Sequence, residues 1–413
     1  MFYKEADFKD EPLIGEIPKD WESIKLEEVV EIHDSKRIPL SEIERKNRKG
    51  QYPYCGANGI IDYIDDYIFD GEFVLLAEDG GSYGRLENTA YIMNGKFWVN
   101  NHAHILRAIE GKTSNLFLKH ALDFLDLNPY IVGSTRKKLN QEQMREIKIP
   151  FPPFEEQRAI VGVLGVVDSV IAKTGEVIAK TERLKKGLMQ TLLTRGIGHK
   201  EYKQTPIGTI PKEWEVVKVK DVANLQSGGT PSRDKPEYWE NGTIPWIKSG
   251  ELNDAEIYNA EEKITELGLK NSNAKIFPKG TLLMALYGKG TVSKTAILRI
   301  DAATNQAVCA FTPKNGNFNP KYMQHCLIFM RNRLLNQLTN PSSDVGRTNI
   351  YMGMLESFKI PLPKKVEEQK KIAEILSTAD EELNLLRSEK LKFERIKRGL
   401  MDLLLTGKIR VKV

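Results

Sequence analysis

Two long stretches of the chain carry apolar residues at the spacing of a helix that packs against a second helix. Residues 155–193 and 367–405 contain no proline, and small or apolar side chains recur in both every three or four positions. The pattern is typical of a coiled-coil seam, and 39 residues would extend roughly 58 Å as an α-helix. We expect the two helices to pair with each other, antiparallel, rather than to be unrelated surface helices. The residues expected in this pairing are Ile160, Val167, Val170, Leu184, Leu188, Ile372, Ala379, Leu386, Phe393 and Leu400.

Both helices belong to an internal duplication, and repeats of this kind decide how the whole fold is interpreted. The segment Ile14–Trp21 returns as Ile207–Trp214, and Ile147–Pro152 returns as Phe358–Pro363. After one inserted residue, a constant offset of 212 runs through both helices. Chance similarity would not keep one register over so many residues, so the chain contains two copies of one structural frame.

The segments between the repeated borders, about 23–132 and 216–344, are largely unlike each other. A packing scaffold has little reason to vary only its inserts, whereas a recognition protein does. Both inserts read as mixed strand and turn with some helix. Residues 73–77 and 281–286 are expected to be buried strands, each followed by a Gly-rich loop.

These patterns predict an α+β fold: two mixed α/β recognition domains separated by two long antiparallel helices in a coiled coil, with pseudo-two-fold duplication. The expected order is a first domain at 1–152, a helix at 153–195, a polar linker at 196–206, a second domain at 207–363, a helix at 364–405 and a basic tail at 406–413, frayed at Lys408–Val413. Each helix should end at a glycine, Gly196 or Gly407, because glycine readily forms a left-handed C-cap.

The composition sets broad limits on the class of protein. The net charge of +5, from 61 basic and 56 acidic residues, is compatible with DNA binding through local patches but does not indicate it. No run approaches the roughly 18 apolar residues of a membrane span. Three scattered cysteines without CxxC spacing argue against disulfides and structural zinc, and favour a reducing, cytoplasmic location.

Both inserts contain loops whose residue types suit nucleic acid. An amide or imidazole can face a base edge, and cations among Gly, Ser and Asn can meet phosphates. The residues that we expect to contact DNA are Lys36, Arg37, Tyr83, Arg85, Asn101, His102, His104, Arg136 and Lys137 in the first insert. In the second they are Arg233, Lys248, Ser249, Tyr287, Lys289, Lys294, Asn305, Gln306, Arg347 and Asn349. The alternatives are that Asn101 and Asn305 only hold a turn, and that any single cation is a solvated surface charge.

Patterns for catalysis are incomplete. Residues 288–295 nearly match a phosphate-binding loop, but Ser293 replaces the required glycine and a strand-like run follows where a helix is needed. The Pro152-Pro153-Phe154 run echoes a motif of amino-methyltransferases, but Phe151 precedes it in place of a polar residue. His102 and His104 lack a third candidate ligand for a metal. We therefore expect no catalytic, cofactor-binding or metal-binding residues in this chain.

The arrangement resembles the specificity (S) subunit of type I restriction–modification systems over essentially all 413 residues. The most specific features are the paired IPKDW and IPKEW openings and the paired borders IPFPPFEEQ and IPLPKKVEEQ, of which the second is one residue longer and more basic. Within the inserts, residues 99–104, 245–252 and 303–308 also resemble family segments.

The resemblance implies one recognition domain for each half of a bipartite double-stranded DNA target. It implies that the helix pair sets the distance between the halves and docks two methyltransferase (M) subunits, with restriction (R) subunits joining the complex. S-adenosylmethionine for adenine methylation, and ATP and Mg²⁺, would then bind those partners and not this chain. Two other functions stay open: a coiled-coil protein-interaction scaffold without DNA specificity, and the recognition part of an enzyme with methylation or cleavage fused in one chain.

Overall fold

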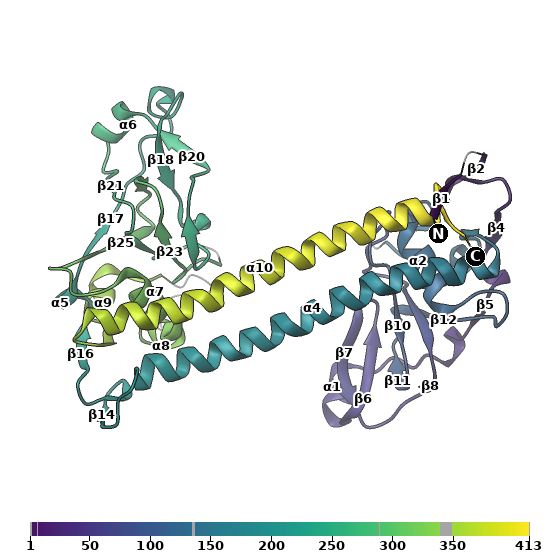
Figure 1. Ribbon diagram of the computed structural model, residues 1–413, viewed down its shortest axis with the longest axis horizontal. Coiled ribbons are helices and arrows are strands. Elements are labelled where there is room, and N and C mark those ends of the chain that lie inside the picture. The colour runs from purple at the N-terminus through teal and green to yellow at the C-terminus, as the bar shows by residue number, and fades with distance from the viewer. Residues whose placement is uncertain (1, 6, 134–136, 289, 339–348, 413) are drawn as a thin grey trace. The chain divides into compact units, whose positions relative to one another are not determined.

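The computed structural model describes residues 2–5, 7–133, 137–288, 290–338 and 349–412 (Figure 1). The chain forms two compact units. Unit 1 consists of residues 1–176 and 388–413, and unit 2 of residues 177–387. Each unit therefore contains one variable domain together with part of each long helix, so the compact units do not follow the domain limits expected from the sequence.

Two four-stranded sheets form the domain of unit 1, in the orders β10-β9-β12-β5 and β7-β6-β11-β8. Their strands are β5 Val30–Ile32, β6 Lys49–Gly56, β7 Gly59–Ile64, β8 Phe69–Asp70, β9 Phe73–Ala77, β10 Ala90–Met93, β11 Lys96–Val99 and β12 Ala103–Ala108. Buried side chains from both sheets, among them Phe69, Phe73 and Phe97, form one apolar cluster. The prediction of a buried strand at 73–77 is confirmed.

Short helices and two-stranded sheets complete unit 1. Helix α2 lies against β9, β10 and β12 (Figure 1). The helices are α1 Glu42–Asn47, α2 Asn115–Phe124 and α3 Gln141–Arg145. The two-stranded sheets pair β2 Phe8–Glu11 with β3 Gly15–Pro18, and β4 Glu22–Lys25 with β13 Lys148–Phe151.

Unit 2 repeats this topology with one additional strand, β19, which pairs in parallel with β23, although its insert has a different sequence. Its sheets have the orders β17-β25-β22-β23-β19 and β20-β18-β24-β21. The parallel pair β6–β11 of unit 1 has its equivalent in the parallel pair β18–β24. The strands are β16 Glu215–Lys218, β17 Ala223–Ser227, β18 Ile244–Ile247, β19 Ala255–Ile257, β20 Glu262–Ile264, β21 Ile276–Phe277, β22 Leu282–Ala285, β23 Thr295–Leu298, β24 Ala302–Thr304, β25 Val308–Pro313 and β26 Lys359–Leu362. The helices are α5 Val219–Val222, α6 Glu266–Lys270, α7 Pro320–Phe329, α8 Arg331–Leu338 and α9 Met352–Ser357.

The two predicted long helices are present as α4 Phe154–Arg195 and α10 Val366–Leu405. Within unit 1, Lys397 Nζ lies 2.7 Å from Asp168 Oδ1, and within unit 2, Lys185 forms an ion pair with Asp380. An offset of 212 relates Asp168 to Asp380 and Lys185 to Lys397, so the two ion pairs are copies of one contact. The duplication seen in the borders therefore extends to the contacts between the helices.

The buried face of α4 differs from the predicted seam at one position. Ile160 and Ile372 are buried in the cores of units 1 and 2. Leu184, however, is 61% exposed, and the prediction that it pairs the helices is wrong. The neighbouring Lys185 takes that place on the helix and reaches α10 through its ion pair, because a long aliphatic stem can cover apolar surface while its charged end finds a carboxylate.

The repeated borders contact each other at the start of each long helix. In unit 1 the indole N–H of Trp21 donates to Glu156 Oε2 over 3.2 Å. In unit 2 Trp214 donates to Glu368 over 3.3 Å. Both indoles are buried, so the carboxylate satisfies a donor that would otherwise lose its hydrogen bond to water. This contact explains why the Trp of each opening and the Glu-Glu-Gln of each border recur together.

The helix ends meet the same tryptophans. Gly196 (φ +65°) follows α4 and Gly407 (φ +67°) follows α10, as predicted for glycine C-caps. A Cβ at Gly196 would lie 2.8 Å from Trp214 Cζ2, and one at Gly407 would lie 2.3 Å from Pro18 Cγ. Glycine is therefore required at both positions for two reasons. It allows the positive φ, and it leaves room for the repeated Ile-Pro-Lys-Asp/Glu-Trp segment that packs against it.

Two strands close to the chain ends pair with each other in unit 1. Strand β1 Phe2–Lys4 pairs with β27 Ile409–Val411 (Figure 1). Arg410 is buried and donates to Glu156 over 2.7 and 2.9 Å and to Asp20 over 2.9 and 3.0 Å. These hydrogen bonds, first of all the one to Glu156, raise the pKa of Arg410. The expectation that the tail frays is therefore wrong.

The expected linker also contains regular structure. Strand β14 Tyr202–Thr205 lies inside 196–206 and pairs with β15 Gly208–Pro211. This hairpin corresponds to β2–β3 of unit 1, so a strand replaces part of the predicted linker.

We predict that Gly407→Ala destabilises unit 1 by about 2 kcal/mol or more, because it adds both positive-φ strain and overpacking against Pro18. Urea denaturation followed by circular dichroism measures the change. Gly399→Ala in α10 is the matched control: nothing lies within 4 Å of its Cβ position. Alanine at this helical site should stabilise the protein by about 0.5–1 kcal/mol. Equal effects of both substitutions would contradict the role given to Gly407.

Each unit also buries a histidine beside the ion pair between the long helices. His120 of α2 lies 3.5 Å from Asp168, and His325 of α7 lies 4.0 Å from Asp380. Burial lowers the pKa of His120 to about 3 and that of His325 to about 4. Both rings are therefore neutral at neutral pH.

Acid should destabilise unit 2 through His325. The pKa in the folded state, about 4, lies below the ordinary value of 6.5, so the stabilisation is complete above pH 6.5 and is lost as the pH falls toward 4. The loss should reach roughly 3 kcal/mol near the lower value. His325→Gln cannot take up this proton and should flatten the acid side of the curve of unfolding free energy against pH. Parallel curves for both proteins would show that His325 does not contribute.

Candidate nucleic-acid interface

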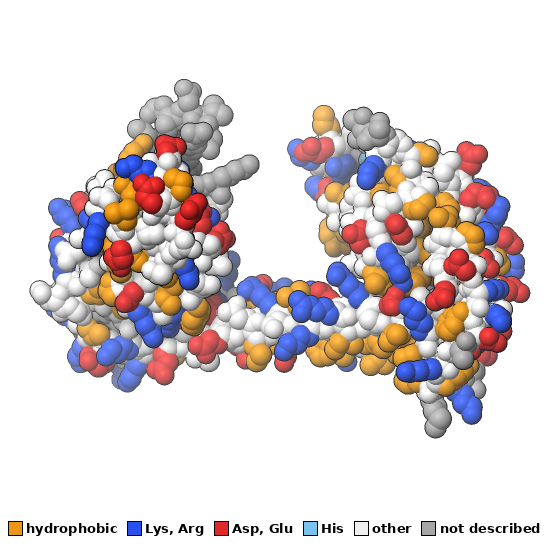
Figure 2. All heavy atoms as spheres, turned by 90° about the horizontal axis from the view of Figure 1, so that it is seen from above, with side chains coloured by type: hydrophobic (Ala, Val, Ile, Leu, Met, Phe, Trp, Pro, Cys, Tyr) orange, Lys and Arg blue, Asp and Glu red, His pale blue; other side chains and the backbone are white. Residues whose placement is uncertain are grey.

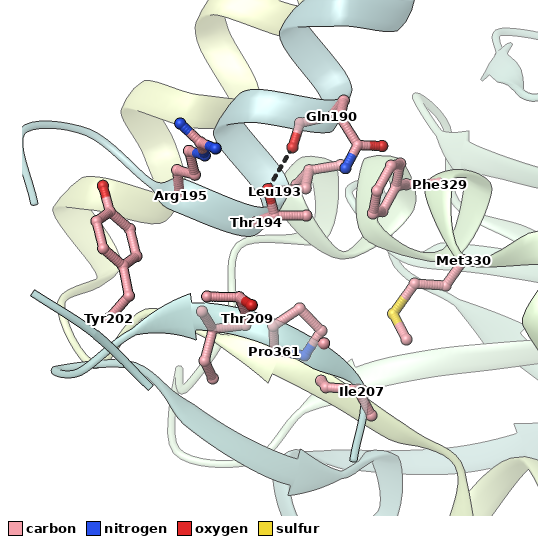
Figure 3. Close-up of a pocket in the computed structure, with 12 residues that line it drawn as sticks. Gln190, Leu193, Thr194, Arg195, Tyr202, Ile207, Thr209, Phe329, Met330 and Pro361 are labelled. Carbon is pink, nitrogen blue, oxygen red and sulfur yellow. Dashed lines mark hydrogen bonds between the residues drawn. The ribbon is translucent and has the colours of Figure 1, made fainter. Parts of the chain in front are cut away.

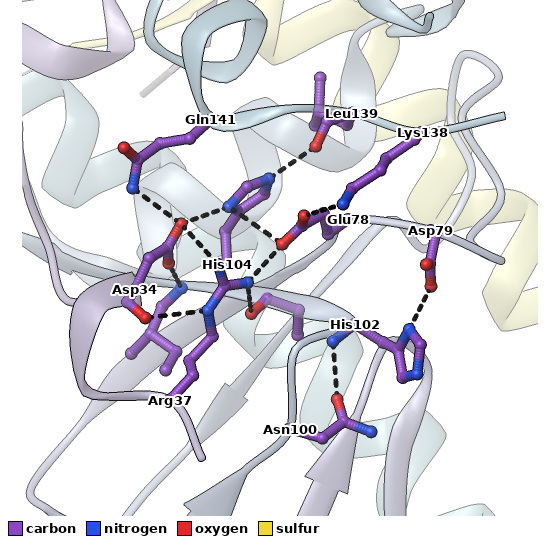
Figure 4. A network of polar contacts seen from close by, with 12 residues as sticks. Asp34, Arg37, Glu78, Asp79, Asn100, His102, His104, Lys138, Leu139 and Gln141 are labelled. Carbon is purple, nitrogen blue, oxygen red and sulfur yellow. Dashed lines mark hydrogen bonds and ion pairs between the residues drawn. The ribbon is translucent and has the colours of Figure 1, made fainter. Parts of the chain in front are cut away.

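A buried polar network supports the loops at one end of the sheets in unit 1 (Figure 4). His104 of β12 is completely buried, with Nδ1 2.6 Å from Asp34 Oδ2 and Nε2 2.8 Å from the carbonyl oxygen of Leu139. Burial opposes the ionisation of Asp34, but its hydrogen bonds with His104 and Ile105 N–H hold its pKa below the ordinary value. The network joins segments distant in the sequence and gives the loops above it a defined position.

Two predicted DNA contacts belong to this supporting layer. Arg37 pairs with Glu78 and donates to the carbonyl oxygen of Ala103 over 3.0 Å. Burial opposes the ionisation of Glu78, but hydrogen bonds from Lys138 and Arg37 lower its pKa overall. The prediction that His104 contacts DNA is wrong because its ring is inaccessible, and Arg37 already has its carboxylate partners.

Tyr83 and Arg85 are also used inside unit 1. Tyr83 is 5% exposed, with its hydroxyl 3.4 Å from the carbonyl oxygen of Ala77, so its predicted DNA contact is wrong as well. Arg85 forms an ion pair with Asp402 of α10, and its guanidinium carbon lies 4.7 Å from the centre of the Phe124 ring. It therefore ties the loop after β9 to the end of α10. Lys36, Asn101 and Lys137 are exposed.

Beside the network, unit 1 has an open hollow of about 390 Å³. It lies between the β6–β7 turn, the loop after β9 and the loop between β11 and β12. Its lining consists of Ala57, Asn58, Gly59, Ile60, Ile61, Asp79, Gly80, Asn100 and His102. Of the predicted contacts, His102 lies in this hollow.

The other side chains of the hollow were not predicted from the sequence, although one pattern in it indicates some of them. Asn58-Gly59 between two strand-like runs is typical of a tight hairpin turn. Asp79, Ile60 and Ile61 carry no such signal, because their position depends on pairing between strands that are distant in the sequence.

Equivalent asparagines hold the loop at this end of each parallel strand pair. Asn100 N–H donates to the carbonyl oxygen of Cys55 and Asn305 N–H to that of Ile247, both over 3.0 Å. Their Oδ1 atoms accept from the backbone N–H two residues ahead, over 2.8 and 3.1 Å. Asn305 therefore holds a turn, the alternative considered for it, and its partner in unit 1 is Asn100. Asn101 corresponds instead to Gln306.

Three of the predicted cations in unit 2 are paired with carboxylates. Arg233 lies 2.5 Å from Glu262 and its guanidinium carbon 3.5 Å from the Trp239 ring centre. Lys248 contacts Glu262 and Glu261, both over 2.9 Å, and these hydrogen bonds raise its pKa. Lys294 contacts Asp254 over 2.9 Å. These pairs reduce the charge available to phosphates.

The remaining candidates of unit 2 have varied surroundings. Gln306 is exposed and accepts from Thr230 over 2.5 Å, while Ser249 begins a short 3-10 helix. Tyr287 and Asn349 are half-buried, and burial raises the pKa of Tyr287. Arg136, Lys289 and Arg347 lie outside the described residues.

Over the visible faces of each unit, basic and acidic side chains are interspersed (Figure 2). A second hollow, of about 600 Å³, lies in unit 2 beside the end of α4, where Gln190 and Leu193 face Ile207, Phe329 and Met330 (Figure 3). It is lined mainly by apolar and neutral polar side chains of the repeated borders and not by the loops at the strand ends.

The structure also bears on the expected chemistry. Burial raises the pKa of each thiol, Cys55, Cys309 and Cys326, to about 12, so the described cysteines are poor nucleophiles. Strand β23 follows the near-match to a phosphate-binding loop, as predicted. Within the described ranges, no three His, Cys, Asp or Glu side chains are grouped to hold a metal ion, and no helix has the length and apolarity to cross a membrane.

Known proteins are similar to this chain in sequence and in fold. A family model described as the type I restriction modification DNA specificity domain matches residues 18–183 and again 211–394. The specificity subunit of the type I restriction enzyme MjaVIII from Methanocaldococcus jannaschii is 29% identical over 433 aligned residues, covering 100% of this chain and 98% of the relative. A putative type I restriction enzyme specificity subunit from Haemophilus influenzae is 32% identical over 66% of each chain.

Solved structures agree in fold. The S subunit of a type I restriction–modification system from M. genitalium aligns with a TM-score of 0.61 at 14% identity, over 95% of this chain and 97% of its own. A chain from a structure concerning complex assembly of the type I system aligns with a TM-score of 0.53 at 16% identity. Because the family model matches most of the chain in two copies, this protein belongs to the family of type I restriction–modification DNA specificity (S) subunits.

Proposed function

We propose that the chain reads a bipartite double-stranded DNA target, with the variable domain of each unit reading one half-site. One observation carries this proposal: equivalent loops on one topology present different side chains. The residues after β11 are Asn100, Asn101 and His102, whereas those after β24 are Asn305, Gln306 and Ala307. The asparagine that shapes the loop is kept, and the two side chains that follow it differ. This is the pattern expected where two domains of one fold read different base pairs.

We further propose that the long helices dock two methyltransferase subunits through exposed apolar side chains. Leu184 of α4 is 61% exposed and Ile396 of α10 is 51% exposed. The offset of 212 relates these two positions, so the same exposed apolar feature occurs once in each half. An exposed leucine and an exposed isoleucine at equivalent positions of the two halves suit two copies of one partner better than a single partner that binds through two different surfaces.

On this proposal the chain itself is not catalytic. The methyltransferase subunits bind S-adenosylmethionine and methylate adenine, and the restriction subunits that join the complex use ATP and Mg²⁺. The high pKa of the thiols and the incomplete phosphate-binding motif support this division of labour. A protein-interaction scaffold without DNA specificity is the alternative, and it would show neither sequence preference nor salt-dependent DNA affinity.

The first test is methylation of genomic DNA after co-expression with the methyltransferase subunit of the same system, mapped by long-read sequencing. We expect a single modified motif of two defined halves with a fixed gap, because the two domains are parts of one chain. A cell without the specificity subunit is the control. A stable complex that modifies no motif would favour the scaffold.

The second test concerns the docking positions. We expect Leu184→Lys or Ile396→Lys to weaken one of two methyltransferase sites by on the order of tenfold, since each places a charge in an apolar contact. Native mass spectrometry of the complex then shows the species with one methyltransferase subunit.

Leu385→Lys provides the matched control for this test. Leu385 is equally exposed, at 55%, but its equivalent in α4 is already a lysine, Lys173. It should leave two subunits bound. If all three variants retain two subunits with unchanged affinity, the docking proposal fails.

A further inference from the structure

The hollow of unit 1 combines a fixed polar group with an apolar wall, and this combination points to one kind of base pair. The inference rests on the proposed function, because it assigns what the domain of unit 1 reads. The hollow has a volume of about 390 Å³ and opens to solvent between three loops. Asn58 Nδ2 donates to the carbonyl oxygen of Gly80 over 2.9 Å and so ties the β6–β7 turn to the loop after β9.

His102 is held at several points, which fixes the direction of its ring. Its Nδ1 lies 2.7 Å from Asp79 Oδ1, its backbone N–H donates to Asn100 Oδ1 over 2.8 Å, and its carbonyl oxygen accepts from Glu78 N–H over 2.9 Å (Figure 4). The ring nevertheless remains 38% exposed. Such a side chain loses little conformational entropy when it meets a ligand.

The contact with Asp79 determines what His102 offers to DNA. A carboxylate oxygen accepts hydrogen bonds, so Nδ1 carries the hydrogen in this contact. In the tautomer with its hydrogen on Nδ1, Nε2 is a hydrogen-bond acceptor. In the major groove, the donors that match an acceptor are the exocyclic amino groups of adenine and cytosine. Guanine presents acceptors at the corresponding edge and is disfavoured.

The apolar side chains that line the hollow distinguish between these two bases. Ile60 is 47% exposed and Ile61 is 56% exposed at the start of β7. Exposed isoleucines at the start of a strand that borders these loops suit the C5-methyl group of thymine, which is the partner of adenine. The partner of cytosine has no methyl group. Amine and methyl therefore occur together in an A·T pair and not in a C·G pair.

We infer that this hollow reads an A·T base pair in the major groove of one half-site, with His102 Nε2 accepting from the adenine amino group and Ile60 and Ile61 contacting the thymine methyl group. Asp79 acts as a positioning residue that keeps the acceptor of His102 directed into the hollow. The equivalent position in unit 2 is Ala307, so the other half-site is read differently.

The test begins with methylation motifs of the full complex. His102→Ala should relax one A·T position in one half of the motif and leave the other half unchanged. Ile60→Ser should relax the same position in favour of C·G. Ile43→Ser is the matched control: Ile43 is 72% exposed in α1 of the same unit and lies outside the hollow. It should leave the motif as in the wild type.

A binding cycle tests the individual contacts even for a variant that no longer supports methylation. The affinity of the purified complex is measured by fluorescence anisotropy on its own target and on two modified duplexes. Uracil in place of the thymine should lower the DNA affinity of the wild-type complex roughly fourfold, and that of the Ile60→Ala complex much less. Purine in place of the adenine removes the amino group. The resulting loss of DNA affinity should be larger for the wild type than for His102→Ala, by a factor on the order of five.

The possible outcomes separate this inference from the proposed function. If the wild type modifies no bipartite motif, the proposed function itself fails. If a bipartite motif exists but His102→Ala leaves both halves unchanged, or relaxes a G·C pair, the proposed function stands and the inference about the hollow is overturned. Equal losses in the wild type and the variants on the modified duplexes would also overturn it.

Discussion

The hydrogen bond from a buried indole to a glutamate at the first turn of a long helix is the contact on which the rest of the structure depends. It occurs as Trp21–Glu156 and again as Trp214–Glu368. Each carboxylate also has a second partner three residues beyond a helix-ending glycine: Arg410 for Glu156 and His199 for Glu368. One carboxylate in each unit, buried for Glu156 and half-buried for Glu368, therefore contacts the end of one long helix, the opening of a half and the start of the other helix. Removing one partner would leave a buried charged or donor group unsatisfied, which is costly.

The predictable parts of the fold are those where a sequence pattern is compatible with only one local structure. A proline-free stretch with an apolar stripe predicts a helix, and glycine at its end predicts a C-cap. The sequence predicted less well which residues of α4 face α10, because Leu184 and Lys185 are adjacent and either can lie toward the partner helix. Hydrophobicity favours Leu184 at this position, but Lys185 lies there because it forms an ion pair with Asp380. That partner is 195 positions away in the sequence, so no local pattern indicates it.

The candidate site shows the same limit. Residue type indicated amides, imidazoles and cations in the loops, but type alone does not separate a side chain that supports a loop from one that faces solvent. His104 and His102 are two residues apart on one strand and its loop, and only His104 is enclosed by Asp34 and Leu139. The one-residue difference between Asn100 and Asn101 arises from strand pairing with Cys55, which no local pattern contains. Several of the predicted cations, such as Arg233, Lys248 and Lys294, are paired with carboxylates, and the residue type alone does not indicate this pairing.

The reciprocal ion pairs of the long helices have a consequence for the origin of the chain. Each half carries both an aspartate and a lysine of the contact, Asp168 with Lys185 and Asp380 with Lys397, and each group finds its complement in the other half. A contact of this kind is isologous, the type found between identical subunits related by a two-fold axis. A chain of half the length would therefore already possess a self-complementary helix face, and fusing two copies would convert a concentration-dependent association into an intramolecular one and free the two inserts to diverge.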